Sequence, residues 1–206
     1  MKIAKPLQNL IDSFERLPGI GPKTAQRLSY YLLHVPQTDL DSFSLALSRL
    51  KTDTVLCSIC KNVSESDPCP ICADPSRDHS QVLVIEQPLD IIAFEKTSKF
   101  KGVYHVLHGS INPLDNIGPD EIYIEDLIKR ISSRNSHITE VIVATNPTME
   151  GEATAMYISK MIMGIKSGNG KGLRLTRLGI GIPTGAQLEF ADESTLIQAF
   201  EGRKEI

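Results

Sequence analysis

Long apolar segments are missing from this sequence of 206 residues. No run approaches the roughly 18 apolar residues that a membrane-spanning helix needs, and no positively charged start leads into an apolar stretch typical of a signal peptide. The protein is therefore expected to have neither feature and to act in the cytoplasm. Its hydrophobic content of 41% still permits a buried core, in one large domain or in two or three small modules.

An excess of positive charge is also missing. The 22 Lys and Arg residues face 25 Asp and Glu residues, and the net charge of −3 argues against a globally basic nucleic-acid binder. Positive residues nevertheless gather locally, which matters more for a binding surface. Residues 1–34 hold five cations and two acids, and residues 166–177 hold four cations and no acid: Lys166, Lys171, Arg174 and Arg177.

Nucleotide-binding motifs are absent, as are internal repeats and low-complexity tracts. The glycine-rich run 168–172 lacks the spacing of a phosphate-binding loop, because Lys171 is followed by Gly172 and not by Ser or Thr. The pair Gly179 and Gly181 could begin a dinucleotide fingerprint, but Thr184 stands where the third glycine belongs. Nucleotide binding is therefore not expected.

Cysteine is scarce, and its spacing is informative. The four cysteines form the pattern Cys57-x2-Cys60-x8-Cys69-x2-Cys72. Two such pairs are typical of a tetrahedral zinc site, and four protein ligands leave no open position for chemistry, so the pattern predicts one structural zinc ion. The alternatives are four buried or free thiols, or a redox pair. His79 could be a spare ligand, but we interpret it as a loop histidine.

Two helical patterns near the start, Leu7–Phe14 and Lys23–Leu33, are separated by a turn of sequence Leu-Pro-Gly-Ile-Gly-Pro. The glycines of that turn, Gly19 and Gly21, leave backbone amides bare beside the positive end of the second helix, and this arrangement suits an anion. Lys23 and Arg27 lie four apart on one helical face and can neutralise phosphates. We predict sequence-independent DNA binding through these four residues; the alternative is an ordinary helix–helix turn.

The rest of the sequence alternates strand and helix patterns, which favours a parallel α/β sheet with helices on its faces. Before it, a third helix is expected from Leu40 to Leu50, capped by Thr38 or Asp39. A last helix is expected after Asp192, with Arg203 and Lys204 at its end. The expected strands are Gln81–Glu86, Gly102–Leu107, Glu140–Thr145 and Leu173–Leu178, and the expected helices between them are Leu89–Glu95, Ile122–Ser132 and Glu152–Ile165.

Carboxylates follow two of these strands. Glu86 ends the first strand, and Glu150 and Glu152 follow the third, so the three could meet at one edge of the sheet and hold magnesium. This part resembles the Toprim domain of topoisomerases and primases, but Asn146 and Thr148 stand where that domain has two metal-binding aspartates. Two neutral side chains hold a divalent cation poorly, so catalysis is not expected. The glutamates are then either a weak metal or partner site, or residues that cap the following helix.

The remaining tyrosines and histidines offer no catalytic arrangement. Tyr104, Tyr123 and Tyr157 lie within predicted elements and are interpreted as packing residues. His105 and His108 are three apart in a predicted strand, so they should face opposite sides and not pair on a metal.

A helix-hairpin-helix, a four-cysteine zinc finger and a Toprim domain, in this order, resemble the bacterial RecR family over nearly the whole chain, and residues 179–190 are similar to that family's C-terminal segment. The corresponding segments are 1–53, 54–77, 78–175 and 176–206, the last of them helical, within a multidomain α/β fold.

The resemblance implies a non-catalytic DNA-binding mediator of recombinational repair that acts with RecO or RecF to load RecA onto single-stranded DNA. It also implies a ring-like homotetramer, and it makes the surface of Glu86, Asn146, Thr148, Glu150 and Glu152 a partner-binding or vestigial metal site. The alternatives are a Toprim nuclease or topoisomerase, and a zinc module that binds only proteins.

Overall fold

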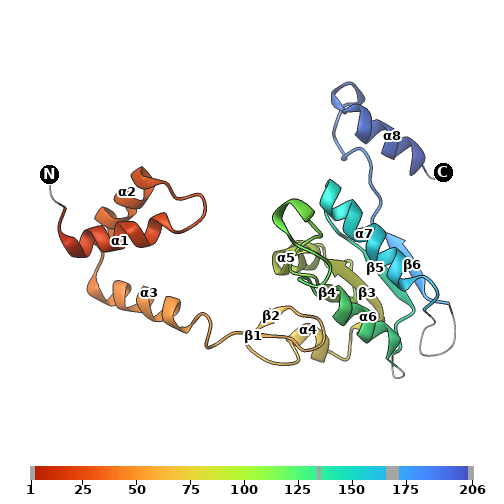
Figure 1. The fold of residues 1–206 in the computed structure, drawn as a ribbon, viewed down its shortest axis with the longest axis horizontal. Helices are drawn as coiled ribbons and strands as arrows, with labels where there is room; N and C mark the ends of the chain where they lie inside the picture. Colours follow the sequence, from red (N-terminus) through yellow and green to blue (C-terminus); the bar gives the residue numbers. More distant parts are fainter. Residues whose placement is uncertain (1–2, 134–135, 166–171, 204–206) are drawn as a thin grey trace. The chain divides into compact units, whose positions relative to one another are not determined.

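The computed structural model describes residues 3–133, 136–165 and 172–203, which form two compact units, Met1–Thr54 and Val55–Ile206 (Figure 1). Lys166, Lys171 and Lys204, which the sequence pointed to as local cations, lie outside these residues. So do residues 168–170 of the glycine-rich run. Among the described helices, none has the length and apolar character needed to cross a membrane.

The first unit contains three helices: α1 (Lys5–Glu15), α2 (Pro22–Leu32) and α3 (Gln37–Arg49). Helices α1 and α2 contact each other and bury Ile11 and Ala25, which confirms the predicted helix, turn and helix. The expected start of the third helix was wrong, because α3 begins directly after Pro36. The proline ring fixes φ of residue 36 at −54°, a value compatible with a helix start, and Asp39 falls in the first helical turn and not at the cap.

The second unit begins with the cysteine segment. A short antiparallel pair, β1 (Val55–Leu56) and β2 (Val63–Ser64), joins its two arms, and the one-turn helix α4 (Pro70–Ala73) follows. Pro70 occupies the first position of α4, where its missing N–H is not needed.

A four-stranded sheet follows, in the order β4-β3-β5-β6, and all three of its strand pairs are parallel. The strands are β3 (Asp78–Ile85), β4 (Gly102–Val106), β5 (Glu140–Val143) and β6 (Arg174–Arg177). All four predicted strands and their parallel arrangement are confirmed. Strand β3 begins three residues before the predicted start, so His79 is a strand residue and the loop interpretation was wrong.

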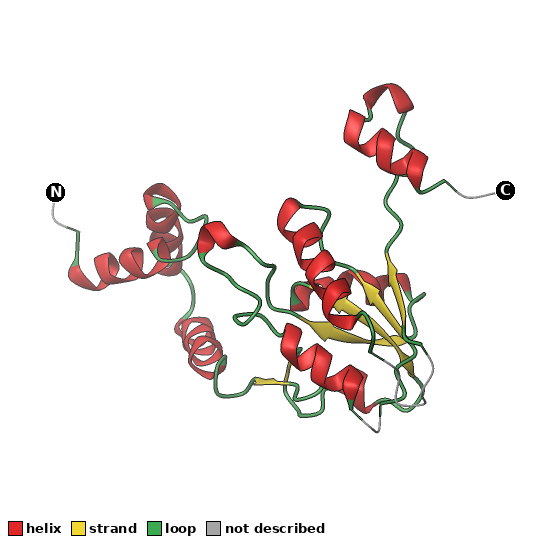
Figure 2. Cartoon of the chain, turned by 45° about the vertical axis from the view of Figure 1, so that its right-hand side comes forward, coloured by secondary structure: helices red, strands yellow, loops and turns green. Residues whose placement is uncertain are grey.

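Helices cover both faces of this sheet (Figures 1 and 2). They are α5 (Pro88–Thr97), α6 (Ile124–Ser132) and α7 (Met149–Ile162). Alternate residues of β3 supply the two cores: Val82 and Val84 pack with α6 and α7, whereas Leu83 and Ile85 pack with α5. This layered arrangement brings the carboxyl ends of β3 and β5 to one edge, where the acidic residues of the sequence follow.

Helix α7 begins and ends three residues before its predicted bounds. The Thr148 hydroxyl accepts a hydrogen bond from the Gly151 amide at 3.1 Å and so starts the helix early, and Gly164 adopts a left-handed φ of +91° just after it. The last helix, α8 (Glu193–Glu201), is capped as predicted, since Asp192 accepts a hydrogen bond from the Thr195 amide at 2.9 Å.

Candidate functional site

The turn between α1 and α2 leaves backbone groups open to solvent. Gly19 adopts a left-handed φ of +81°, which a side chain would strain, and Gly21 is the N-cap of α2 without a side chain to cap it. A Cβ at either glycine would meet no atom within 4 Å, so neither glycine is packed against the rest of its unit. The amides of the first turn of α2 have no side-chain cap, as an anion site requires.

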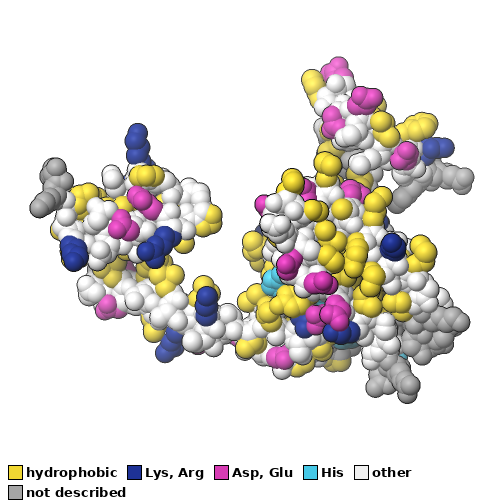
Figure 3. Space-filling view, viewed as in Figure 1, with side chains coloured by type: hydrophobic (Ala, Val, Ile, Leu, Met, Phe, Trp, Pro, Cys, Tyr) yellow, Lys and Arg dark blue, Asp and Glu magenta, His cyan; other side chains and the backbone are white. Residues whose placement is uncertain are grey.

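Two cations accompany these amides on α2. Lys23 and Arg27 are both exposed, and neither forms an ion pair within the described part of the chain. On the face of this unit seen in Figure 3, Lys and Arg side chains project into solvent beside a few acids. The four residues predicted from the sequence thus lie on one short stretch of structure. The charges of Lys23 and Arg27 are free to meet phosphates.

The four cysteines of the second unit come together in a buried cluster. Their Sγ atoms all lie within 4.8 Å of one another, and each cysteine is at most 8% exposed. Two backbone turns position them: Lys61 N donates to Cys57 O at 2.9 Å, and Ala73 N donates to Cys69 O at 3.0 Å. None of the four is in a disulfide.

This sulfur cluster has the dimensions of a zinc site. Four thiolates at about 2.3 Å from a tetrahedral Zn²⁺ lie about 3.8 Å apart, close to the 3.5 Å between the sulfur atoms of Cys60 and Cys69. A hydrogen bond from Cys72 lowers the pKa of the Cys60 thiol to about 5, whereas burial raises the pKa of Cys69 to about 11. The packed thiols therefore already favour one thiolate, and a divalent cation would favour all four.

The cysteine segment is attached to the sheet by contacts that start at Cys60 and Lys61. Val106 N of β4 donates to Cys60 O at 2.8 Å, and the His108 ring lies 2.6 Å from Lys61 O. The Lys61 ammonium forms an ion pair with Asp126 of α6 at 2.7 Å and lowers the pKa of that carboxyl. The cysteine segment and the sheet therefore share a continuous set of contacts.

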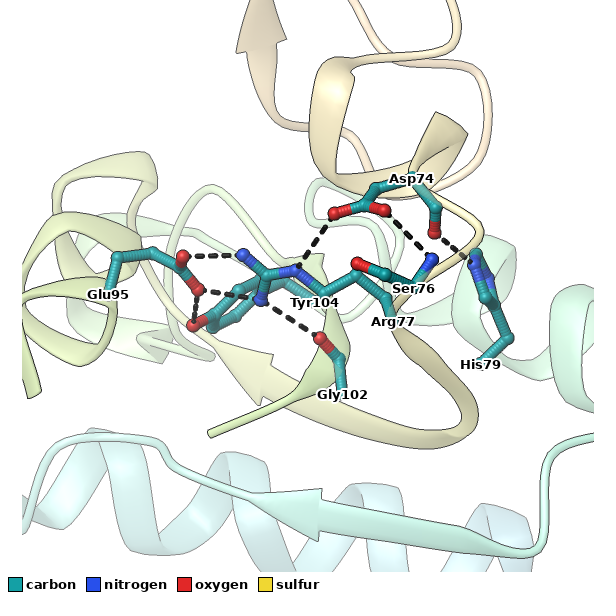
Figure 4. Close-up of polar contacts among 7 residues, drawn as sticks. All are labelled: Asp74, Ser76, Arg77, His79, Glu95, Gly102 and Tyr104. Atoms are coloured by element: carbon teal, nitrogen blue, oxygen red, sulfur yellow. Dashed lines mark hydrogen bonds and ion pairs between the residues drawn. The ribbon is translucent and has the colours of Figure 1, made fainter. Parts of the chain in front are cut away.

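A second set of contacts orders the connection into β3 (Figure 4). Arg77 donates to both carboxylate oxygens of Glu95 on α5, at 2.8 and 2.5 Å, and to Gly102 O at 3.3 Å. The Tyr104 hydroxyl donates to the same carboxylate at 2.5 Å, and the Arg77 bond lowers the pKa of Glu95. Tyr104 is thus a packing residue, as predicted, whose hydroxyl is satisfied inside this group.

At the carboxyl edge of the sheet, both side-chain oxygens of Glu86 are hydrogen-bonded within the protein. Glu86 is 7% exposed, and its two oxygens accept hydrogen bonds from the backbone N–H of Asn146 at 2.8 Å and from Asn146 Nδ2 at 2.6 Å. An aspartate at position 146 would bring a second negative charge to Glu86 and would require a cation between them. The asparagine supplies N–H donors in place of that cation, so both oxygens of Glu86 have hydrogen-bond partners without a metal.

The other two glutamates of this edge do not converge on Glu86. Glu150 and Glu152 lie in the first turn of α7, where the helix dipole favours them, and Glu152 forms an ion pair with Arg177 of β6. Within the described residues, the only group of three or more acidic, histidine or cysteine ligands close enough to share an ion is the cysteine cluster. The expected gathering of three carboxylates for magnesium was therefore wrong, and Thr148, not a glutamate, caps α7.

The two histidines of this region have separate environments. His105 is fully buried in β4 and its Nε2 lies 2.8 Å from Tyr123 O, and burial lowers its pKa to about 4. His108 lies beyond β4 in a left-handed conformation, so the prediction that both occupy one strand was wrong. His105 turns to Tyr123 O and His108 to Lys61 O, so the two rings have different partners.

Sequence reasoning missed the residues that join the zinc segment to the sheet. Lys61 stands next to Cys60, and this position was a signal that it belongs to the cysteine segment. Arg77, Asp126 and Arg130 had no local signal, because each acts through a partner 18 to 65 positions away: Glu95, Lys61 and Tyr104 O, respectively.

These observations define a class of protein: a Toprim-type α/β domain without the carboxylate set for metal catalysis, joined to a four-cysteine zinc finger and a helix-hairpin-helix. Family models match the chain accordingly. They are the RecR helix-hairpin-helix at residues 7–51, the RecR four-cysteine zinc finger domain at 52–74, the Toprim domain at 80–178 and the RecR C-terminal region at 181–204. The chain belongs to the RecR family.

Family membership fixes the broad function. The chain is a non-catalytic recombination mediator of DNA repair despite its Toprim domain, and the alternative of a nuclease or topoisomerase is set aside on this ground. It carries a zinc finger of the four-cysteine type, whose clustered thiols are consistent with one structural zinc ion. DNA and RecO or RecF are the partners that the family implies.

Proposed function

We propose that the chain holds the phosphate backbone of single-stranded DNA at the turn between α1 and α2, without reading bases. The open turn with two unpaired cations carries this proposal: the amides near Gly19 and Gly21 would donate hydrogen bonds to one phosphate, and Lys23 and Arg27 would neutralise its neighbours. Such contacts position the strand and are independent of its sequence, which suits a protein that must act on any damaged site.

Replacing Lys23 and Arg27 with alanine tests this role. We expect affinity for a labelled single-stranded oligonucleotide to fall by at least about tenfold, because two phosphate contacts are lost. The slope of log K against log salt should also decrease by about 1.4, since each single-strand contact contributes about 0.7. Fluorescence anisotropy at several salt concentrations measures both quantities. The matched control removes two exposed lysines of the other unit, Lys96 and Lys99; equal losses in both variants would contradict the proposal.

We propose that the end of β5 and the start of α7 form an acidic surface that docks a basic face of RecO or RecF. Asn146, Thr148, Glu150 and Glu152 supply this surface, and Glu86 lies beneath it and holds Asn146. Glu150 forms no side-chain ion pair within the described residues, so its charge is available to a partner.

Reversing the charge of Glu150 tests the acidic surface. Glu150→Lys should weaken RecO or RecF binding by about tenfold in a calorimetric titration, because like charges would then face each other. Glu65→Lys, at an exposed position of the zinc segment, makes the same change of charge elsewhere. If both variants bind like the unsubstituted protein, the docking surface lies elsewhere.

We propose four functional segments with bounds 1–53, 54–77, 78–175 and 176–206, and a ring-like homotetramer that acts in the cytoplasm. The assembly is consistent with α3, which buries none of its residues and exposes Phe43, Leu45 and Leu47. Light scattering with and without DNA measures the assembly; a mass of one chain in both conditions would exclude the tetramer.

We further propose Cys57, Cys60, Cys69 and Cys72 as the ligands of the zinc ion.

A further inference from the structure

A hollow with a cavity volume of about 550 Å³ lies between the zinc segment and helix α6, within the second unit. Its lining is rich in nitrogen-bearing side chains: His79 of β3, Lys129 and Arg130 of α6, and His137 before β5. Serine hydroxyls at positions 58, 133 and 136 lie among them. Such a lining offers many hydrogen-bond donors, and an anion with several oxygens is the ligand that uses them.

Arg130 is the most enclosed cation of this hollow. Its Nη1 donates to Tyr104 O at 2.8 Å, and no other hydrogen bond of its guanidinium occurs within the described residues. Burial lowers the pKa of Arg130, while the neighbouring cysteines oppose that effect. The side chain is therefore held in place by one bond and has further N–H groups to offer to an anion, while the cysteines already supply part of its counter-charge.

The acids near the hollow are already paired. Asp126, which lines it, forms the ion pair with Lys61 at 2.7 Å. Glu125 pairs with Lys129 at 2.8 Å, but these side chains are 74% and 67% exposed, so that pair is weak and Lys129 is free to turn toward a ligand. His79 is engaged with Asp74 O at 3.0 Å, which leaves Lys129, Arg130 and His137 as the available donors.

We propose that this hollow binds a phosphate group through Arg130, Lys129 and His137. The phosphate is either part of a DNA backbone or a free phosphate, because both present the same oxygens to these donors. If the phosphate belongs to DNA, the hollow is a second DNA contact, far in the sequence from the turn between α1 and α2, and this case rests on the proposed DNA-binding function. Binding of a free phosphate does not depend on that function.

The test uses the full-length zinc-loaded protein and the double variant Lys129→Gln with His137→Gln. Both side chains are exposed, so the fold should be retained, which zinc content and thermal melting verify. Lys160→Gln, at an exposed position of α7, is the control. Arg130→Lys is a second variant that keeps the positive charge but loses the planar guanidinium.

Inorganic phosphate is titrated while the NMR signals of the histidine rings are followed, and binding of a single-stranded oligonucleotide is measured at several salt concentrations.

We expect the double variant to bind inorganic phosphate about tenfold more weakly, since two donors to the anion are lost, and Arg130→Lys to be weakened as well. If the salt slope for the oligonucleotide also falls by about 0.7, the phosphate is that of DNA. If the slope is unchanged while phosphate binding is lost, the ligand is a free phosphate. Equal phosphate titrations and equal slopes in all proteins would overturn the proposal. The Lys23 and Arg27 variant separates the two sites, because it should lose DNA affinity and retain phosphate binding.

Discussion

Cys57→Ser should leave the protein with less than one zinc per chain and should unfold the segment around the remaining cysteines. Serine is a poor ligand for Zn²⁺, and metal binding in such segments is coupled to their folding. Because Cys60 O and Lys61 bind β4 and α6, the sheet loses its attachment as well. We expect a loss of about 3 kcal/mol or more, which for a protein of this size lowers the melting temperature by about 10 °C.

Atomic emission measures the zinc, and hydrogen exchange reports the segment itself. The amides of Lys61 and Ala73, which donate to Cys57 O and Cys69 O, should exchange rapidly in the variant. Glu65→Gln, at an exposed position of the same segment, is the matched control. A Cys57 variant with full zinc content and an unchanged melting temperature would show that the cluster is not the zinc site.

Gly151→Ala should destabilise the protein by about 3 kcal/mol, although alanine normally favours a helix by about 1 kcal/mol over glycine. A Cβ at this position would lie 2.0 Å from Asn146 O and 2.9 Å from Glu86 Oε1, and the first of these is backbone that cannot rotate away. The loop after β5 would have to shift, and the Glu86–Asn146 pair would break with it. The variant should therefore also lose affinity for RecO or RecF.

Urea denaturation measures the change in the free energy of unfolding. Ala153→Ser lies on the exposed side of the same helix and should stay within about 0.5 kcal/mol of the unsubstituted protein. A Gly151 variant that is more stable than the starting protein would mean that helix propensity dominates and that the loop is not packed on α7.

Features with a local signature were predicted correctly. The paired cysteines, the glycine turn and the four strands each depend on residues close in sequence, and the structure places them as expected. The Asp192 cap belongs to the same group, because the side chain binds an amide three residues away. Strand and helix bounds differed by up to three residues where one residue decided the matter, such as Pro36 before α3 or Thr148 before α7.

Features that depend on distant partners could not be predicted. Glu86 meets Asn146 across 60 positions of sequence, so the pattern could show a missing metal ligand but not the hydrogen bonds that replace the metal. Three carboxylates near one sheet edge likewise indicated a shared site, whereas Arg177 draws Glu152 toward β6. Pairing between elements depends on sheet order and helix placement, and a single sequence does not specify either in that detail.

The four clustered cysteines and the groups that anchor their segment differ in their order along the chain. All four sulfur atoms are present once residue 72 has been synthesised, whereas the anchoring groups Val106, His108 and Asp126 follow later. A nascent chain can therefore capture its metal before the strand that will support it exists. The metal-bound segment then offers Cys60 O and Lys61 as ready-made partners when β4 emerges from the ribosome.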